Sequence, residues 1–401
     1  VNERVVHEAA SALRGGDAQR LGALMSEAQA LFDRLARPAC PEQLDSPVLH
    51  RVLAHEPLRP HVFGGKGVGS QGDGSAQFVA RSADDQRKVV EILERDLDVK
   101  CLTLTLGSGP QVRKALIPAA GFGAQLFPAS KATKKELFPV VDRDGIAKPA
   151  ILLIVEEALE AGIEEVVIVV QEGDLDDFRS FFDTQISIEN FNKLPRHFQE
   201  YARRILDIGR RVTFVTQTAQ EGFGHAVHCA REAIGDEPFL LMLGDHIYRS
   251  TGESSCARQL VEAYQRSGKC VVGLRRTPES QIAAFGTATG IWMEAEELLN
   301  ITEFAEKPNL DYARSNLRVP GLPDDEYLTV FGQYVIKPQL FAHLEEQIRN
   351  NVRERGVFQL TSVLDRLRQE EGVQGLAVQG QRFDIGLPDH YLETLQTFRR
   401  D

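Results

Sequence analysis

The stretch from residue 114 to residue 139 combines a glycine-rich segment with a basic cluster. An apolar run at 115–118 leads into four residues with little or no side chain, which are Ala119, Ala120, Gly121 and Gly123. Backbone amides of such residues can approach phosphate oxygens closely. With the lysines that follow, the stretch predicts a nucleoside triphosphate site, whereas the glycines alone would equally fit an ordinary connector between a strand and a helix.

Two aspartates far apart in the sequence could share a divalent cation. Asp245 follows the apolar run 239–243, and Asp384 follows Arg382 and Phe383. Mg²⁺ prefers a few carboxylates together with phosphate oxygens and water. We therefore predict a magnesium site at these two residues, although a single aspartate at the end of a strand often only caps a turn or a helix.

The glycine-rich stretch resembles the signature of the sugar-nucleotide pyrophosphorylases, and the nearest match is the bacterial UTP:glucose-1-phosphate uridylyltransferase family. The matching residues are Gly121, Gly123, Pro128, Lys131, Lys135 and Pro139. The resemblance runs from about residue 114 to the C-terminus. It implies that Lys135 neutralises charge near the reacting phosphates and that Asp245 and Asp384 bind Mg²⁺. The alternative for Lys135 is a solvated lysine in a basic run.

The signature is interrupted at one catalytic position. Where the family has Thr-Arg after the second glycine, this chain has Ala124 and Gln125. The family's arginine contacts the triphosphate, and a neutral glutamine supplies neither its charge nor its fork of donors. Lys134, which stands where many relatives have proline, is a candidate replacement for the charge.

Further motifs imply how the two substrates are recognised. Gln217 and Gly222 resemble the family's base-reading residues, and an amide can pair with both the donors and the acceptors of uracil. Uridine and thymidine are not distinguished at this point. His225 in the same segment is interpreted as a capping or packing residue.

The sugar side of the resemblance rests on three motifs. Glu306 and Lys307 resemble the motif in which a carboxylate accepts hydrogen bonds from sugar hydroxyls and a lysine pairs with the sugar phosphate. Gly286 and Gly332 resemble glycine steps beside the sugar ring, where the ring must lie against backbone. The identity of the sugar stays open, because hydroxyl stereochemistry is read by loops that the motifs do not capture.

Composition favours a soluble enzyme. The chain has 401 residues, of which 42% are hydrophobic and 26% charged, and no tract is long and apolar enough to span a membrane. Its formal net charge of −12 argues against a nucleic-acid-binding surface. The five cysteines show no zinc or disulfide spacing, which favours a reducing cytoplasm.

Strands and helices are expected to alternate after residue 111. A helix at 151–161 is followed by strands at 166–170, 212–216 and 239–243. This order predicts an α/β fold with a mostly parallel, Rossmann-like sheet and helices on both faces, whose ligands lie at the carboxyl ends of the strands. The resemblance implies a GT-A-like nucleotidyltransferase domain over residues 111–401 and a homo-oligomer.

Residues 1–110 are expected to form a small α+β domain. Helices are predicted at 5–13, 18–35 and 84–97, and strands at 77–80 and 100–106. The glycine-rich stretch 65–74 resembles the C-terminal motif of GHMP sugar kinases, and its alternative is a surface loop without a ligand. The ATP-binding motif of that family is absent, so this domain is not expected to be a kinase by itself. We suspect a piece of a longer, bifunctional protein in which an upstream kinase makes the sugar 1-phosphate.

Together these features imply transfer of a uridylyl group from UTP to a sugar 1-phosphate, with Mg²⁺ as cofactor and pyrophosphate as product. The alternative is a catalytically impaired or silent sugar-nucleotide-binding domain, which Gln125 favours.

Overall fold

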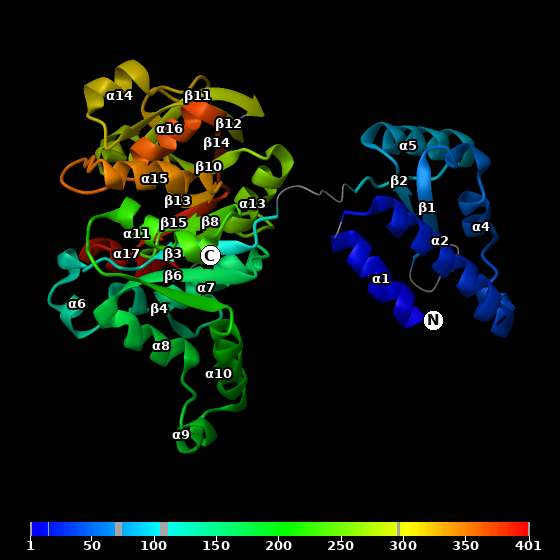
Figure 1. Ribbon diagram of the computed structural model, residues 1–401, viewed down its shortest axis with the longest axis horizontal. Helices are drawn as coiled ribbons and strands as arrows, with labels where there is room; N and C mark the ends of the chain where they lie inside the picture. Colours follow the sequence, from blue (N-terminus) through cyan, green and yellow to red (C-terminus); the bar gives the residue numbers. More distant parts are fainter. Residues whose placement is uncertain (1, 15, 69–73, 105–110, 295–296, 400–401) are drawn as a thin grey trace. The chain divides into compact units, whose positions relative to one another are not determined.

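The computed structural model describes residues 2–14, 16–68, 74–104, 111–294 and 297–399. The chain divides into two compact units, residues 1–108 and residues 109–401 (Figure 1). Among the described residues, no helix combines the length and the apolar character needed to cross a membrane.

The N-terminal unit is a set of helices around one β-hairpin. Its elements are α1 (Asn2–Arg14), α2 (Ala18–Leu35), α3 (Pro41–Leu44), α4 (Pro47–Leu53), β1 (Val62–Gly67), β2 (Ala76–Ala80) and α5 (Ala83–Leu97). Gly22 of α2 and Gly64 of β1 let the two backbones touch, because a Cβ on Gly22 would lie 2.5 Å from Cβ of Phe63. The predicted helices of this unit are confirmed.

The predicted strand at 100–106 is wrong over residues 100–104, the part of it that the structure describes. Residues 100–104 have no regular secondary structure, and Leu102 and Leu104 are 93% and 72% exposed. A strand needs a partner backbone, and β1 and β2 pair only with each other in a two-stranded sheet. Residues 69–73 of the predicted kinase-like glycine stretch lie outside the described residues, so the kinase resemblance stays a prediction.

A nine-stranded sheet forms the centre of the larger unit within its described residues, in the order β10-β14-β12-β11-β13-β8-β3-β6-β7. The strands are β3 (Lys114–Pro118), β6 (Glu165–Gln171), β7 (Val212–Gln217), β8 (Phe239–Met242), β10 (Cys270–Pro278), β11 (Gly286–Glu294), β12 (Leu298–Glu306), β13 (Glu326–Ile336) and β14 (Val373–Ala377). Two small two-stranded sheets pair β4 (Pro139–Val141) with β5 (Ala147–Pro149) and β9 (His246–Ser250) with β15 (Gly380–Asp384).

The sheet is mixed, so the prediction of a mostly parallel sheet is wrong. Strands β8, β3, β6 and β7 are parallel neighbours, as expected from the alternation of strands and helices. Strand β13 is antiparallel to β8, β10 and β11, and β12 is antiparallel to β11 and β14. Strands β11 and β12 are antiparallel because they follow each other closely in the chain and pair without a helical crossover.

Helices cover both faces of the sheet, as predicted (Figure 1). One face packs against α7 (Ala150–Glu160), α8 (Leu175–Asp183), α10 (Arg196–Gly209) and α13 (Cys256–Ser267), and the other against α11 (Phe223–Cys229), α12 (Arg231–Ile234), α15 (Gln339–Arg349) and α16 (Thr361–Glu371). Ala115 and Ile117 of β3 belong to the first core, and Leu116 belongs to the second. Because side chains alternate along a strand, a strand buried on both faces is a continuous apolar run.

Within its described residues, the larger unit contains four further helices. They are α6 (Ala129–Ala132), α9 (Ile188–Lys193), α14 (Leu310–Asn316) and α17 (Pro388–Thr397).

Glu157 is a half-buried carboxyl group that should make stability depend on pH. Its Oε1 accepts a hydrogen bond from the backbone N–H of Ala257 at 2.7 Å, and burial raises the pKa of Glu157 to about 7 from 4.5. The protonated carboxyl group is favoured in the folded protein, where its pKa is about 7, over the unfolded chain, where the pKa is 4.5. Its contribution to stability is therefore fully present below pH 4.5 and is lost as the pH rises through about 7. Glu157→Gln removes this loss, since a neutral amide oxygen can accept the same hydrogen bond.

The quantity to compare is the free energy of unfolding of Glu157→Gln minus that of wild type. We expect this difference to be larger at pH 8 than at pH 5 by roughly 2 to 3 kcal/mol. Chemical denaturation at both pH values, followed by fluorescence of Trp292, measures this difference in the larger unit. The matched control is Glu164→Gln, which replaces an exposed carboxyl group. An unchanged difference at the two pH values would contradict the prediction.

Candidate functional site

The glycine-rich loop leaves the carboxyl end of β3. Ala119 continues the strand pairing, because its N–H donates to the carbonyl of Val169 at 2.7 Å. The carbonyl of Ala120 accepts a hydrogen bond from Nε2 of Gln171 at 2.8 Å, which anchors the start of the loop to the end of β6. Gly123 has φ +72°, a left-handed conformation that glycine adopts without steric cost. The structure thus brings the predicted loop residues together, with Gln171 as an anchor that no motif indicated.

Lys135 lies across this loop. A Cβ on Gly121 would be 3.8 Å from Nζ of Lys135, and a Cβ on Gly123 would be 3.8 Å from its Cδ. Nζ forms an ion pair with Oδ2 of Asp245 at 2.5 Å. Burial lowers the pKa of Lys135, but the charges of Asp245 and Glu136 outweigh it and raise the pKa overall. The lysine is therefore charged and spans from the glycine loop to the carboxylates.

Asp245 reaches this position because the chain after β8 passes very close to β3. A Cβ on Gly244 would lie 2.5 Å from the carbonyl oxygen of Pro118. Only a glycine permits such a close approach of two backbones. Gly244 therefore places Asp245 beside the start of the glycine loop.

The pairing of β9 with β15 brings Asp384 next to Asp245. Asp384 is the register partner of His246, and the N–H of Ile385 donates to the carbonyl of Asp245 at 2.9 Å. A Cβ on Gly386 would lie 3.1 Å from Oδ1 of Asp384 and 3.3 Å from Oδ2 of Asp245. The two carboxylates thus flank one glycine, as predicted for a shared site.

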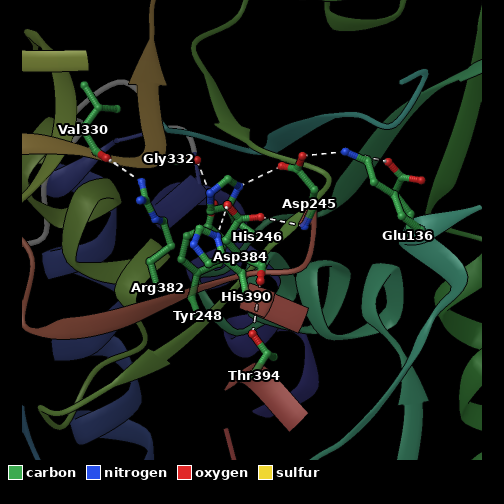
Figure 2. A network of polar contacts seen from close by, with 12 residues as sticks. Glu136, Asp245, His246, Tyr248, Val330, Gly332, Arg382, Asp384, His390 and Thr394 are labelled. Carbon is green, nitrogen blue, oxygen red and sulfur yellow. Dashed lines mark hydrogen bonds and ion pairs between the residues drawn. The ribbon is translucent and has the colours of Figure 1, made fainter. Parts of the chain in front are cut away.

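Two histidines, which the motifs did not indicate, hold these carboxylates (Figure 2). Nδ1 of His246 is 2.8 Å from Oδ1 of Asp245, and Nδ1 of His390 is 3.1 Å from Oδ2 of Asp384. Burial would raise the pKa of Asp245, but His246 and Lys135 lower it well below its usual range. Asp245 is therefore ionised at neutral pH.

The donor set fits a magnesium ion that is completed by substrate. In the described part of the chain, no group of three or more histidine, cysteine, aspartate or glutamate residues could hold a metal ion by itself. Two neighbouring carboxylates suit Mg²⁺, which usually takes one or two carboxylates plus phosphate oxygens and water. Asp245 and Asp384 are the residues that would hold it.

Glu136 is a buried carboxyl group behind Lys135 that the sequence analysis missed. Its side chain is 1% exposed, and its Oε1 lies 3.8 Å from Nζ of Lys135. Oε2 has no hydrogen-bond partner among the described residues. Burial raises the pKa of Glu136 to about 8, although the neighbouring charge of Lys135 opposes this shift. Its position directly after the predicted lysine was the one available signal.

The two residues predicted to read the base lie close together. Gln217 ends β7 and is 5% exposed, and its Nε2 is 3.4 Å from the carbonyl oxygen of Gly222. Gly222 has φ +111°, and a Cβ there would meet Cβ of Val357 at 2.7 Å. Nδ1 of His225 lies 2.9 Å from Nε2 of Gln217, which agrees with a packing role for this histidine.

A cavity of about 280 Å³ contains most of the residues predicted to bind the sugar phosphate. Gly286, Glu306, Lys307 and Asp384 are among its lining residues. Oε2 of Glu306 accepts a hydrogen bond from Oγ1 of Thr361 at 2.9 Å. The cavity therefore joins the predicted sugar motifs to one of the two carboxylates.

Gly332 is not among the residues that line this cavity, although it packs against Leu243, which does line it. It is buried in β13 with φ +98°, and a Cβ there would lie 3.0 Å from Cδ1 of Leu243 and 3.1 Å from Oη of Tyr248. Its carbonyl accepts the hydroxyl of Tyr248 at 2.8 Å. Close packing beneath Leu243 explains the glycine here.

The position that departs from the signature is open to solvent. Ala124 and Gln125 are exposed in a 3₁₀ turn, residues Ala124–Leu126. Nζ of Lys134 forms an ion pair with Oδ2 of Asp174 at 2.8 Å, and both side chains are largely buried. Asp174 therefore neutralises the lysine that was considered as a replacement for the missing arginine.

Comparisons with known proteins agree with this arrangement. A family model described as nucleotidyl transferase matches residues 114–400. A UTP–glucose-1-phosphate uridylyltransferase of Bacillus subtilis is 33% identical over 293 residues, which cover 72% of this chain and 91% of the relative. One from Staphylococcus epidermidis is 34% identical over 278 residues, which cover 69% and 88%.

Solved structures show the same likeness. A crystal structure of apo UDP-glucose pyrophosphorylase superposes with a TM-score of 0.62 and 28% identity, covering 72% of this chain and 98% of that one. A UTP-bound enzyme from Acinetobacter baumannii superposes with a TM-score of 0.58 and 26% identity, covering 72% and 93%.

Proposed function

The chain belongs to the nucleotidyl transferase family, with UTP–glucose-1-phosphate uridylyltransferases among its relatives, and from this premise we propose that it joins UTP and a sugar 1-phosphate into a UDP-sugar. The observation that carries the proposal is the position of Lys135, which spans from the glycine loop to Asp245. One charged group thereby borders both the phosphate-binding backbone and the carboxylate site.

In the proposed reaction, an oxygen of the sugar phosphate attacks the α-phosphorus of UTP. A bond forms between this oxygen and phosphorus, and the bond to the bridging oxygen of pyrophosphate breaks. Lys135 neutralises the charge that the phosphates bring together, and the loop amides at Gly121 and Gly123 orient them. Mg²⁺, when held by Asp245 and Asp384, supplies further charge neutralisation at the phosphates.

Substrate recognition is assigned to the flanking segments. Gln217 and Gly222 would read the pyrimidine, and Glu306 and Lys307 would bind the sugar hydroxyls and the sugar phosphate. These roles are supported by the proximity of Gln217 to Gly222 and by the shared cavity of Gly286, Glu306 and Lys307.

Pyrophosphate release tests this function. We would assay the protein with Mg²⁺, with UTP or dTTP, and with a panel of sugar 1-phosphates that starts with glucose 1-phosphate. Release that requires both substrates supports the proposal, and the fastest sugar names the acceptor. Lack of release with every combination, together with lack of UTP binding in calorimetry, would refute it.

A second candidate is a sugar-nucleotide-binding domain without turnover. The exposed Gln125 favours it, because the loop lacks the arginine charge of the signature. Binding of UTP or a UDP-sugar without pyrophosphate release or exchange would support this alternative.

We also propose that the N-terminal unit is the C-terminal part of a GHMP-type sugar kinase that would supply the sugar 1-phosphate. Its support is the glycine-rich motif and the arrangement of helices around the hairpin β1-β2. An upstream reading frame with the kinase ATP motif would support this proposal.

We also propose that the protein forms a homo-oligomer, and light scattering would test this.

A further inference from the structure

Two arginines from distant parts of the sequence share one aromatic ring beside the cavity. Arg275 lies on β10 and Arg382 on β15. Their guanidinium carbons lie 4.9 Å and 4.4 Å from the centroid of the Phe285 ring. Phe285 and Arg382 both line the cavity that also contains Lys307.

Neither guanidinium is paired with a carboxylate within the part of the chain that the structure describes. Nη1 of Arg382 donates to the carbonyl of Val330 at 2.8 Å (Figure 2). The Nε atoms of Arg275 and Arg382 are buried and have no hydrogen-bond partner among the described residues. Many other arginines of the described chain form ion pairs at the surface, so two half-buried arginines with unpartnered Nε atoms stand apart.

Two like charges in a buried position are costly unless an anion accompanies them. Burial, and then the neighbouring charge of Arg382, lower the pKa of Arg275 to about 10. The guanidinium is still charged at neutral pH. Among carboxylates, Asp384 exerts the strongest electrostatic influence on both arginines, but within the described residues no ion pair joins it to either of them. The ring of Phe285 offers some compensation through cation–π attraction, which is modest.

The chemistry of the pair selects the kind of ligand. Guanidinium groups present planar forks of N–H donors, which match the oxygens of phosphate and carboxylate groups. Arg382 lies two residues before Asp384 on β15, so it borders both the proposed metal site and the sugar motifs. An oxyanion bound here would therefore belong to the sugar substrate.

We propose that Arg275 and Arg382 form a subsite for an oxyanion of the acceptor sugar phosphate, in addition to Lys307. This inference rests on the proposed function. The oxyanion has two possible sources, namely the phosphate on C1 of every acceptor or a carboxylate elsewhere on the sugar. Arg382 contacts it from the cavity wall, and Arg275 adds the second positive charge across Phe285.

Calorimetric binding to wild type, Arg275→Gln and Arg382→Gln tests the subsite. The probes are glucose 1-phosphate, glucuronic acid 1-phosphate and UTP. We expect each variant to bind at least one sugar phosphate about tenfold more weakly or worse, because a hydrogen-bonded charge is lost, while UTP binds unchanged. Arg275→Lys is the matched control that keeps the charge, and it should recover part of the affinity.

The results separate the two sources and the competing explanations. Equal weakening for both sugar phosphates assigns the pair to the C1 phosphate, and weakening for the glucuronic acid derivative alone assigns it to the carboxylate. Unchanged binding of both, combined with a lower melting temperature, would overturn the subsite and leave the arginines as structural partners of Phe285. If wild type binds no sugar phosphate at all, the proposed function itself fails.

Discussion

Changing Ala124-Gln125 to Thr-Arg is expected to raise the turnover number by about a hundredfold or more, because one charged donor aimed at transition-state charge contributes roughly 3 kcal/mol. Both residues are exposed in the turn after Gly123, so the longer side chain can be accommodated without repacking the core. The measurement is kcat for pyrophosphate release from UTP with Mg²⁺ and a saturating sugar 1-phosphate.

Two single changes control for this gain. Gln125→Lys restores positive charge without the guanidinium fork and should give a smaller increase. Lys134→Ala in the original background should leave kcat nearly unchanged, since Asp174 already neutralises Lys134. If Thr-Arg leaves kcat unchanged while the wild-type chain turns over, the arginine is dispensable in this loop. A strong loss of kcat in Lys134→Ala would show that this lysine replaces the arginine after all.

Replacing Asp245 by Asn is expected to lower kcat by roughly a hundredfold to a thousandfold, the range seen when a preorganised electrostatic group is removed. The change removes a negative charge from the proposed magnesium site and leaves the buried ammonium of Lys135 without its ion pair. The dependence of kcat on Mg²⁺ concentration should shift to higher concentrations as well, because only one of the two carboxylates remains.

The effect of Asp245→Asn should be shared by Asp384→Asn and absent from Asp324→Asn. Asp324 is the matched control, since its side chain is 99% exposed. Thermal unfolding of each variant distinguishes loss of chemistry from loss of fold. If Asp245→Asn folds normally and keeps kcat within about tenfold of wild type, the carboxylate cannot have the proposed role in charge stabilisation.

Local patterns in the sequence were sufficient for the elements that carry the site. The apolar run before Ala119 and the small residues after it correspond to β3 and its loop, and the helix and strands expected at 151–161, 166–170, 212–216 and 239–243 are present. These features depend on neighbouring residues, because a buried strand or a left-handed glycine leaves its mark within a few positions. The loop and Asp245 were therefore predictable as parts of a site.

The tertiary structure alone decided which of these parts meet. The register of β15 with β9 brings Asp384 to His246, and the approach of Lys135 to Asp245 joins the loop to the carboxylates. Tertiary packing also places Gly332 against Leu243 and Tyr248, and strand pairing gives a mixed sheet.

The arginine pair at Phe285 is the clearest example of a feature that could not be predicted from the sequence. Arg275 and Arg382 are separated by a long stretch of sequence, and neither has a motif that points to the other. Arg275 lies on β10 of the nine-stranded sheet and Arg382 on β15 of a separate two-stranded sheet, and packing of these two parts brings both guanidinium groups to the ring of Phe285. Contacts between distant segments depend on how whole faces pack, and that information is spread over the entire core rather than written in any short pattern.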